Sequence, residues 1–163
     1  MESRPAFVDE QLVGAFYTPA EQQSAAQKQI LEISDQLIAE LLAADTWVFG
    51  VPMYNFSVPA VFKAYVDQIV RVGKTFSYAT GKPEGLFRNK KLYVVTASGA
   101  DYSSGPYSEM DFVEPYIRAI FGFLGITDIT FIKANGTDEA TVKRTSEEAR
   151  HEIDRGLAAK ALV

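Results

Sequence analysis

The hydrophobic positions of the chain alternate between helical spacing and unbroken apolar runs. From about Ser24 to Ala43 apolar residues recur every three or four positions, which predicts a helix with one buried face. Residues 46–51 form a continuous β-branched and aromatic run that ends at Pro52, and such a run is typical of a strand covered on both faces. Residues 92–96 and 129–132 have the same character and predict two more strands.

The remaining segments predict three helices and two irregular stretches. One helix is expected from Pro59 to a stop at Gly73, and a second between Pro115 and Gly125, since proline suits a first helical turn and glycine a helix end. An alanine-rich, charged helix is expected from about Asp138 to Ala161. Residues 1–22 show no sustained period and predict loop or short irregular structure, while residues 74–89 predict turns.

Strands that alternate with helices through short connections predict an α/β fold, a doubly wound parallel sheet with right-handed crossovers. At 163 residues, without repeats or linkers, the chain is expected to form a single domain over residues 1–163. Three strands make a thin sheet, however, and buried strands normally have neighbours on both sides. The sequence therefore predicts a sheet that is incomplete at its amino-terminal end.

The net charge and the lengths of the apolar runs disfavour two classes of partner, nucleic acids and membranes. The 21 acidic and 16 basic residues give a net charge of −5, which disfavours nucleic acid and anionic membrane surfaces. No apolar run reaches the length of a membrane helix, and the first residues lack the apolar core of a signal peptide. We therefore expect a cytoplasmic protein without a nucleic-acid or membrane partner.

Few residues offer nucleophilic or metal chemistry. The chain has no cysteine, and its single histidine, His151, lies in a charged helical stretch where a solvated side chain is expected. Asp101, Asp111 and Glu114 match no metal-ligand spacing and are interpreted as solvated surface charges. No metal site and no catalytic acid or base are predicted.

The segment between Gly50 and Pro59 is the first candidate for ligand binding, because open α/β sheets bind ligands beyond the carboxyl ends of their strands. Its methionine, tyrosine and phenylalanine could lie along a flat ring, and its asparagine could hydrogen-bond a heteroaromatic edge. The alternative is a tight turn whose aromatic residues cover the core.

The second candidate is the segment from Thr96 to Tyr102, which comes directly after the next strand. Its small residues would let backbone amides approach a ligand closely, and an ordinary flexible loop is the alternative. If the two strands are neighbours, both segments face one crevice.

Four strings of residues, in order along nearly the whole chain, resemble one enzyme family. They are Pro52-Met-Tyr-Asn-Phe56 before the Pro59 helix, Lys74-Thr-Phe-Ser-Tyr78, Thr96-Ala-Ser-Gly99, and Phe121-Gly-Phe-Leu-Gly-Ile-Thr-Asp128. Together they resemble the FMN-dependent NADH-azoreductases, also called NAD(P)H:quinone reductases, whose fold is flavodoxin-like. The first string is the most specific of the four.

The resemblance implies FMN as cofactor and assigns two groups of contacts to it. One loop is expected to wrap the isoalloxazine ring and the other to contact its polar edge; the matching residues are Met53, Tyr54, Asn55 and Phe56 in the first, and Ala97, Ser98, Gly99 and Ala100 in the second. The family usually has a second glycine where this chain has Ala100, so a methyl group is added near the flavin.

The resemblance also implies an activity and a partner. Electrons would pass from NADH or NADPH through the flavin to a quinone or azo compound, and the flavin would carry the chemistry. Family members are homodimers with the flavin near the interface, which implies that Phe76 and Tyr78 border the partner's site.

The chain departs from the family pattern at its start. Family members begin with a strand, a serine-bearing loop for the FMN phosphate, a helix and a second strand, and the first residues of this chain resemble the segment just after that second strand. The strand around Trp47 is therefore expected at a sheet edge. Two alternatives to an active reductase stay open: a non-catalytic flavodoxin-like dimerisation module that has lost tight FMN binding, and a fragment of a full-length reductase.

Overall fold

The structure is a computed structural model that describes residues 5–102 and 105–160. The chain forms two compact units, and each is described by itself. Unit 1 comprises Met1–Trp47, Ala60–Lys91 and Ala119–Thr127; unit 2 comprises Val48–Pro59, Leu92–Arg118 and Asp128–Val163. The single domain over residues 1–163 stays a prediction.

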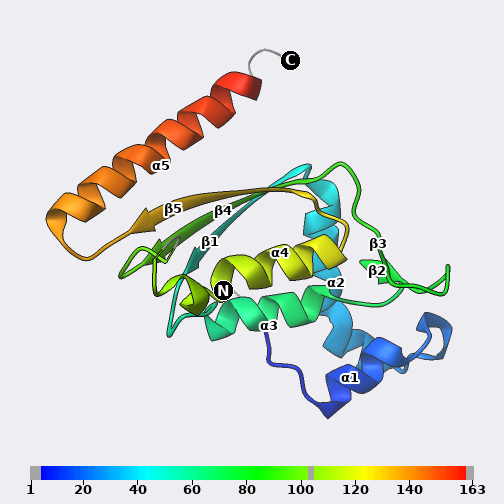
Figure 1. The fold of residues 1–163 in the computed structure, drawn as a ribbon. Coiled ribbons are helices and arrows are strands. Elements are labelled where there is room, and N and C mark those ends of the chain that lie inside the picture. Colours follow the sequence, from blue (N-terminus) through cyan, green and yellow to red (C-terminus); the bar gives the residue numbers. More distant parts are fainter. Residues whose placement is uncertain (1–4, 103–104, 161–163) are drawn as a thin grey trace. The chain divides into compact units, whose positions relative to one another are not determined.

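The larger sheet, most of which belongs to unit 2, contains the three predicted strands. They are β1 (Thr46–Pro52), β4 (Lys91–Ser98) and β5 (Asp128–Asn135), in the order β1-β4-β5. Their arrows point the same way in Figure 1, so the sheet is parallel and the predicted α/β fold is confirmed. Because β1 lies at one end of this order, the expectation of an edge strand is also confirmed for the described sheet.

Among the described residues, unit 2 contains the short 3-10 helix η2 (Ser108–Met110), the helix α5 (Glu139–Lys160) and part of α4 (Val113–Phe123). Helix α5 follows β5 and contacts it. Its first turn is capped by Asp138, whose Oδ1 accepts a hydrogen bond of 2.9 Å from the Thr141 amide. The first half of helix α4 belongs to unit 2. The helix begins two residues before Pro115, where its start was predicted. His151 is exposed on α5.

Unit 1 is built mainly from helices. They are α1 (Glu10–Tyr17), the short 3-10 helix η1 (Ala20–Gln22), α2 (Ala25–Ala43) and α3 (Ala60–Ile69). Helix α2 begins with reciprocal bonds between Ser24 and Gln27: the Gln27 amide donates to Ser24 Oγ at 3.2 Å, and Gln27 Oε1 accepts from the Ser24 amide at 3.0 Å. Helix α1 packs against α2, and α2 packs against α3.

Helix α1 corrects the prediction of loop or short irregular structure at Glu10–Tyr17, while residues 1–4 of that segment lie outside the described residues. It buries Leu12 and Ala15 against Leu31, with Asp9 as its N-cap. Eight residues with a glycine among them are too few to show a sustained helical period, so the helix owes its stability to this packing. Tertiary contacts, which the local pattern did not reveal, decide the structure here.

Trp47 is a buried residue of unit 1 at the start of β1. Its side chain is 4% exposed, and its indole Nε1 donates to the Leu41 carbonyl at 3.0 Å and the Ala44 carbonyl at 3.1 Å. The ring packs edge-on against Phe87, with 4.8 Å between centroids, and lies 6.2 Å from Phe121. The indole therefore fixes the end of α2 at the start of β1.

The segment predicted as turns contains a short hairpin in unit 1. Strands β2 (Phe76–Ser77) and β3 (Glu84–Gly85) pair antiparallel. The Phe76 ring lies 5.6 Å from Tyr78 and 4.8 Å from Phe123. Across residues 5–102 and 105–160, none of the helices combines the length and apolar character of a membrane crossing.

Two glycine substitutions test the packing of unit 1. A Cβ atom on Gly85 would lie 2.1 Å from the Leu124 carbonyl carbon, whereas a Cβ on Gly14 in α1 meets nothing within 4 Å. We expect Gly85→Ala to reduce the free energy of unfolding by about 1–3 kcal/mol or more. Gly14→Ala should raise it by up to about 1 kcal/mol, because alanine favours the helix. Urea denaturation of both variants measures this, and equal effects would contradict the packing described.

Candidate functional site

A tight turn follows β1 and carries the most unusual backbone of unit 2. Tyr54 and Ser57 exchange both backbone hydrogen bonds, at 2.9 and 3.1 Å, so Asn55 and Phe56 form the two central residues. Their φ angles are +49° and +70°. Asparagine tolerates this left-handed region, but a phenylalanine there is rare and costs on the order of 1–2 kcal/mol. Such strain persists only where the surrounding structure imposes it.

Three contacts impose the conformation of this turn. The Phe56 carbonyl accepts a 3.0 Å bond from the Phe112 amide, and the Phe56 ring packs edge-on against Tyr102 at 6.0 Å. The Met53 amide donates to the Ala97 carbonyl at 2.8 Å and so extends the pairing of β1 with β4. Tyr54 is 62% and Phe56 38% exposed, so neither aromatic side chain of the turn is buried in a core.

A cleft of about 420 Å³ opens in unit 2 beyond the carboxyl ends of β1, β4 and β5. Five of the eight predicted flavin contacts line it: Met53, Tyr54, Ala97, Ser98 and Gly99. The other three do not line it and are exposed: Asn55, Phe56 and Ala100. The structure thus brings residues of both predicted loops to one cleft, and their role in binding stays a prediction.

The Ser98 side chain joins the ends of β4 and β5. Its hydroxyl lies 2.6 Å from the Ala100 carbonyl and 2.8 Å from Asn135 Oδ1, and its single proton serves one of these acceptors at a time. The Gly136 amide adds a 2.8 Å bond to the Ser98 carbonyl. Ala100 therefore contributes through its carbonyl, which helps to hold Ser98 at the cleft.

The wall of the cleft formed by β5 and α5 was not predicted. Asn135 is buried, and its carbonyl accepts a 2.8 Å bond from Thr145 Oγ1. The residues of this wall are Ala134, Asn135, Gly136, Thr137, Val142, Thr145 and Ser146. The signal for it was the polar Asn-Gly-Thr string directly after a strand, to which the rule for carboxyl ends also applies.

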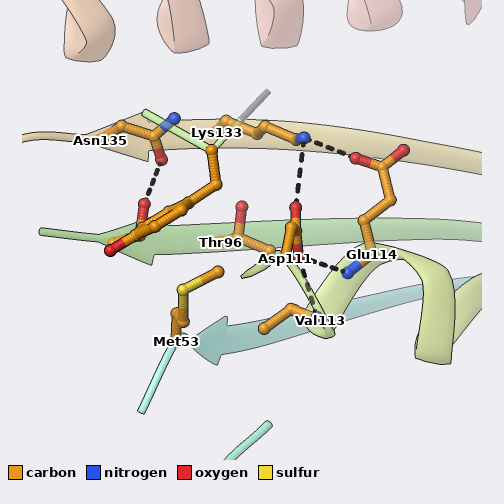
Figure 2. A pocket seen from close by; sticks show the side chains of 9 residues that line it. Met53, Thr96, Asp111, Val113, Glu114, Lys133 and Asn135 are labelled. Carbon is orange, nitrogen blue, oxygen red and sulfur yellow. Dashed lines mark hydrogen bonds and ion pairs between the residues drawn. The ribbon is translucent and has the colours of Figure 1, made fainter. Parts of the chain in front are cut away.

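A smaller cavity lies beside the cleft and shares Met53, Ser98 and Asn135 with it (Figure 2). Figure 2 shows Lys133 directed toward two carboxylates: its Nζ lies 2.5 Å from Glu114 Oε2 and 3.9 Å from Asp111 Oδ2. Asp111 Oδ1 accepts from the amides of residues 113 and 114, at 2.9 and 3.1 Å, and so caps α4.

These contacts correct the interpretation of Asp111 and Glu114 as solvated charges. Their side chains are only 14% and 25% exposed, whereas Asp101 is exposed. Partial burial alone would raise the pKa of Glu114, but the hydrogen bonds and charges of Lys133 and Arg118 outweigh it and hold that pKa below its usual value. Among the described residues, no group of three or more His, Cys, Asp or Glu side chains could hold a metal ion.

Comparison with known proteins agrees with this architecture. Residues 2–157 match the family model described as "Flavodoxin-like fold", and the chain therefore belongs to this family. Among its relatives is the FMN-dependent NADH:quinone oxidoreductase 1 of Trichormus variabilis, 53% identical over 78% of this chain. Another, from Nostoc punctiforme, is 46% identical over 93% of this chain and 75% of its own length. The chain covers only 60% of the Trichormus protein.

Solved structures are similar as well. The azoreductase AzrA has 28% identity and a TM-score of 0.82, over 91% of this chain and 75% of its own. An FMN-dependent NADH-azoreductase from Bacillus anthracis, solved in complex with FMN, has 25% identity and a TM-score of 0.81, over 94% of this chain and 77% of its own. The resemblance of the sequence to this family is thereby confirmed.

The strained turn predicts that glycine at position 56 gives a more stable protein than valine, the reverse of the order expected from apolar surface alone. Phe56→Gly relieves the positive φ, whereas Phe56→Val places a β-branched residue where it is least tolerated. We expect Phe56→Val to be less stable than Phe56→Gly by about 1–2 kcal/mol, although valine retains more apolar surface. Chemical denaturation of the two variants measures the difference. A more stable valine variant would contradict the turn.

The carboxylate of Glu114 predicts a dependence of stability on pH. Its pKa is lower in the folded chain than in the unfolded one, so it stabilises the fold above about pH 4.5, and this contribution is lost as the pH falls through the folded pKa. At pH 7 we expect Glu114→Gln to cost up to about 1 kcal/mol. The difference from the parent chain should shrink at pH 3.

Glu148→Gln is the matched control for Glu114→Gln. Glu148 pairs with Arg144 on α5, but its side chain is 60% exposed. Its replacement should change the free energy of unfolding by less than about 0.5 kcal/mol at either pH. A loss from Glu114→Gln that stays constant between pH 7 and pH 3 would refute the role of the ionised carboxylate.

Proposed function

We propose that this chain is an FMN-dependent oxidoreductase that passes electrons from NAD(P)H through the flavin to a quinone or an azo compound. One observation carries the proposal: the carboxyl ends of β1, β4 and β5 border one cleft, and both loops implied by the family resemblance contribute to it. The relatives named as FMN-dependent NADH:quinone oxidoreductases support the cofactor and the donor.

The residues of the cleft fit a flat heteroaromatic ring system. Met53, Tyr54 and Val142 offer apolar surface, and Ala97 and Gly99 leave space between them. The Ser98 hydroxyl and the Asn135 amide supply polar groups for the edge of the ring. A volume of about 420 Å³ lies within the range of small-molecule sites.

In this proposal the side chains of the cleft position the cofactor and do not react themselves. Bound FMN supplies the hydride and electron chemistry. The strained turn at Asn55–Phe56 holds Met53 and Tyr54 in one orientation, and Ser98 fixes the ends of β4 and β5 relative to each other. The exposed Tyr54 ring provides a surface on which a flat donor or acceptor can stack.

The finer assignments come from the relatives and belong to the same proposal. NADH is the donor that their names give, and NADPH is the alternative donor. Quinones and azo compounds are the two acceptor classes, taken from the names of the oxidoreductases and azoreductases. We further propose a cytoplasmic homodimer in which the partly exposed Phe76 and the exposed Tyr78 border the partner's site.

The charge of the cleft predicts how this chain distinguishes flavins. Its described lining residues carry no ionised side chain, so the FMN phosphate gains no ion pair from them. We expect riboflavin and FMN to bind the 163-residue chain with dissociation constants within about a factor of three, since less than about 1 kcal/mol separates them. Titration followed by flavin fluorescence measures both constants.

A pair of identical substitutions tests the cleft itself. A Cβ on Gly99 meets only Thr137 Cγ2, at 3.6 Å, so Gly99→Val should fold while filling part of the cleft. We expect it to weaken flavin binding by about tenfold or more, the effect of losing about 1.4 kcal/mol. Gly50→Val is the control, because Gly50 lies in β1, outside the cleft lining, with nothing within 4 Å of its Cβ.

The same titration separates the proposal from its alternatives. Flavin binding that Gly99→Val weakens and Gly50→Val leaves intact, accompanied by flavin-dependent oxidation of NADH with a quinone, supports a reductase. Binding without NADH oxidation supports the non-catalytic module. Absence of flavin binding by the parent chain contradicts the proposed site.

A further inference from the structure

A further cavity lies within unit 1, and it shares no lining residue with the flavin cleft. Its volume is about 270 Å³, and it is formed by the end of α1, the connection that follows α1 and the turn after α3. The lining residues are Phe16, Tyr17, Thr18, Pro19, Ala20, Gln23, Arg71, Val72, Gly73 and Lys74. None of the eight predicted flavin contacts is among them.

Arg71 is the unusual residue of this cavity. It is only 5% exposed, and Nη1 bonds to Ser34 Oγ at 2.9 Å and Asp35 Oδ1 at 2.7 Å. The guanidinium carbon lies 5.0 Å from the centre of the Phe16 ring, in a cation–π arrangement. Among the described residues, the buried Nε finds no hydrogen-bond partner. A buried charged donor without a partner is costly, so an acceptor brought within reach of Nε would lower this cost.

The charge around Arg71 also favours an anion. Lys74 is the second cation of the cavity lining, and its Nζ lies 3.7 Å from the same Asp35 oxygen. Within the part of the chain that the structure describes, Asp35 is the carboxylate that pairs with both Arg71 and Lys74, so one carboxylate faces two positive charges. This local excess stands out in a chain whose net charge is −5.

The apolar part of the cavity selects the shape of the anion. Phe16, Tyr17, Pro19 and Val72 provide aromatic and aliphatic surface beside the two cations. An apolar cavity of about 150 Å³ holds a benzene molecule, so about 270 Å³ accommodates one substituted ring. An arginine guanidinium is also the group best suited to a planar carboxylate.

From these observations we propose that the unit 1 cavity binds a small aromatic carboxylate. The ring lies against Phe16 and Tyr17, and the carboxylate accepts from Arg71 and Lys74. This site is independent of the proposed flavin function, because the flavin cleft belongs entirely to unit 2.

Benzoate titration, monitored through the amide signals of the ¹⁵N-labelled full chain, tests the proposal. We expect saturable shifts at residues 16–20 and 71–74, and no comparable saturation with benzyl alcohol, which has the ring without the charge. Flavin titration of the same sample should be unchanged by benzoate, which distinguishes failure of this site from failure of the flavin cleft.

Two exposed residues give variants that keep the fold. Lys74→Gln removes one cation, and we expect benzoate to bind about three- to tenfold more weakly, as for a partly exposed charged partner. Tyr17→Ser, at a ring that is 77% exposed, should weaken binding without lowering stability. Lys82→Gln, at an exposed lysine outside the cavity lining, is the control and should leave binding unchanged.

Several outcomes would overturn the site. The absence of saturable shifts at either segment, or equal binding of benzyl alcohol, removes the proposed recognition of an anion. If Lys74→Gln and Lys82→Gln weaken benzoate binding equally, the binding depends on the net charge of the protein and not on the cavity. Shifts confined to the cleft of unit 2 assign the benzoate to the other site.

Discussion

Backbone hydrogen bonds between the segments that leave the strands hold the candidate site together. The Met53 amide bonds to the Ala97 carbonyl at 2.8 Å, and the Gly136 amide bonds to the Ser98 carbonyl at the same distance. The Phe112 amide bonds to the Phe56 carbonyl at 3.0 Å and holds the strained turn in place. Because each bond joins segments distant in sequence, the cleft exists only when the whole carboxyl edge of the sheet has formed.

The charged side chains around this edge pair with one another, and uncharged side chains line the cleft. Asp111 and Glu114 compensate Lys133 beside the cleft, so that a half-buried ammonium is not left alone next to the site. Uncharged groups, among them Tyr54 and Ser98, remain for the ligand. A neutral, partly apolar cleft beside a compensated ion network suits a flat cofactor that carries its own reactivity.

The local pattern of the sequence predicted those parts of the fold that depend on local chemistry. The runs at residues 46–51, 92–96 and 129–132 are strands, as predicted from their β-branched and aromatic residues. Burial alternates along β4, and Val48 in β1 is 66% exposed, so the expectation that both faces of these strands are covered is wrong for the described chain. Helix α1 was not predicted, because it is short and depends on packing against α2. The capping role of Asp111 was not predicted either, because a cap can be assigned only once the first residue of the helix is known. Predicting the wall of the cleft at residues 134–146 would have required the position of β5 in the sheet, which the spacing of residues along the sequence does not give.

The central claim is that the cleft at the carboxyl edge of the sheet receives a flavin ring. The most direct measurement is an assigned ¹H–¹⁵N spectrum of the chain, recorded with increasing riboflavin. The account predicts saturable shifts at residues 53–56, 97–100 and 135–137, which come from all three strand ends. Saturable shifts that leave these three segments unchanged and fall on α2 or α3 instead would contradict it.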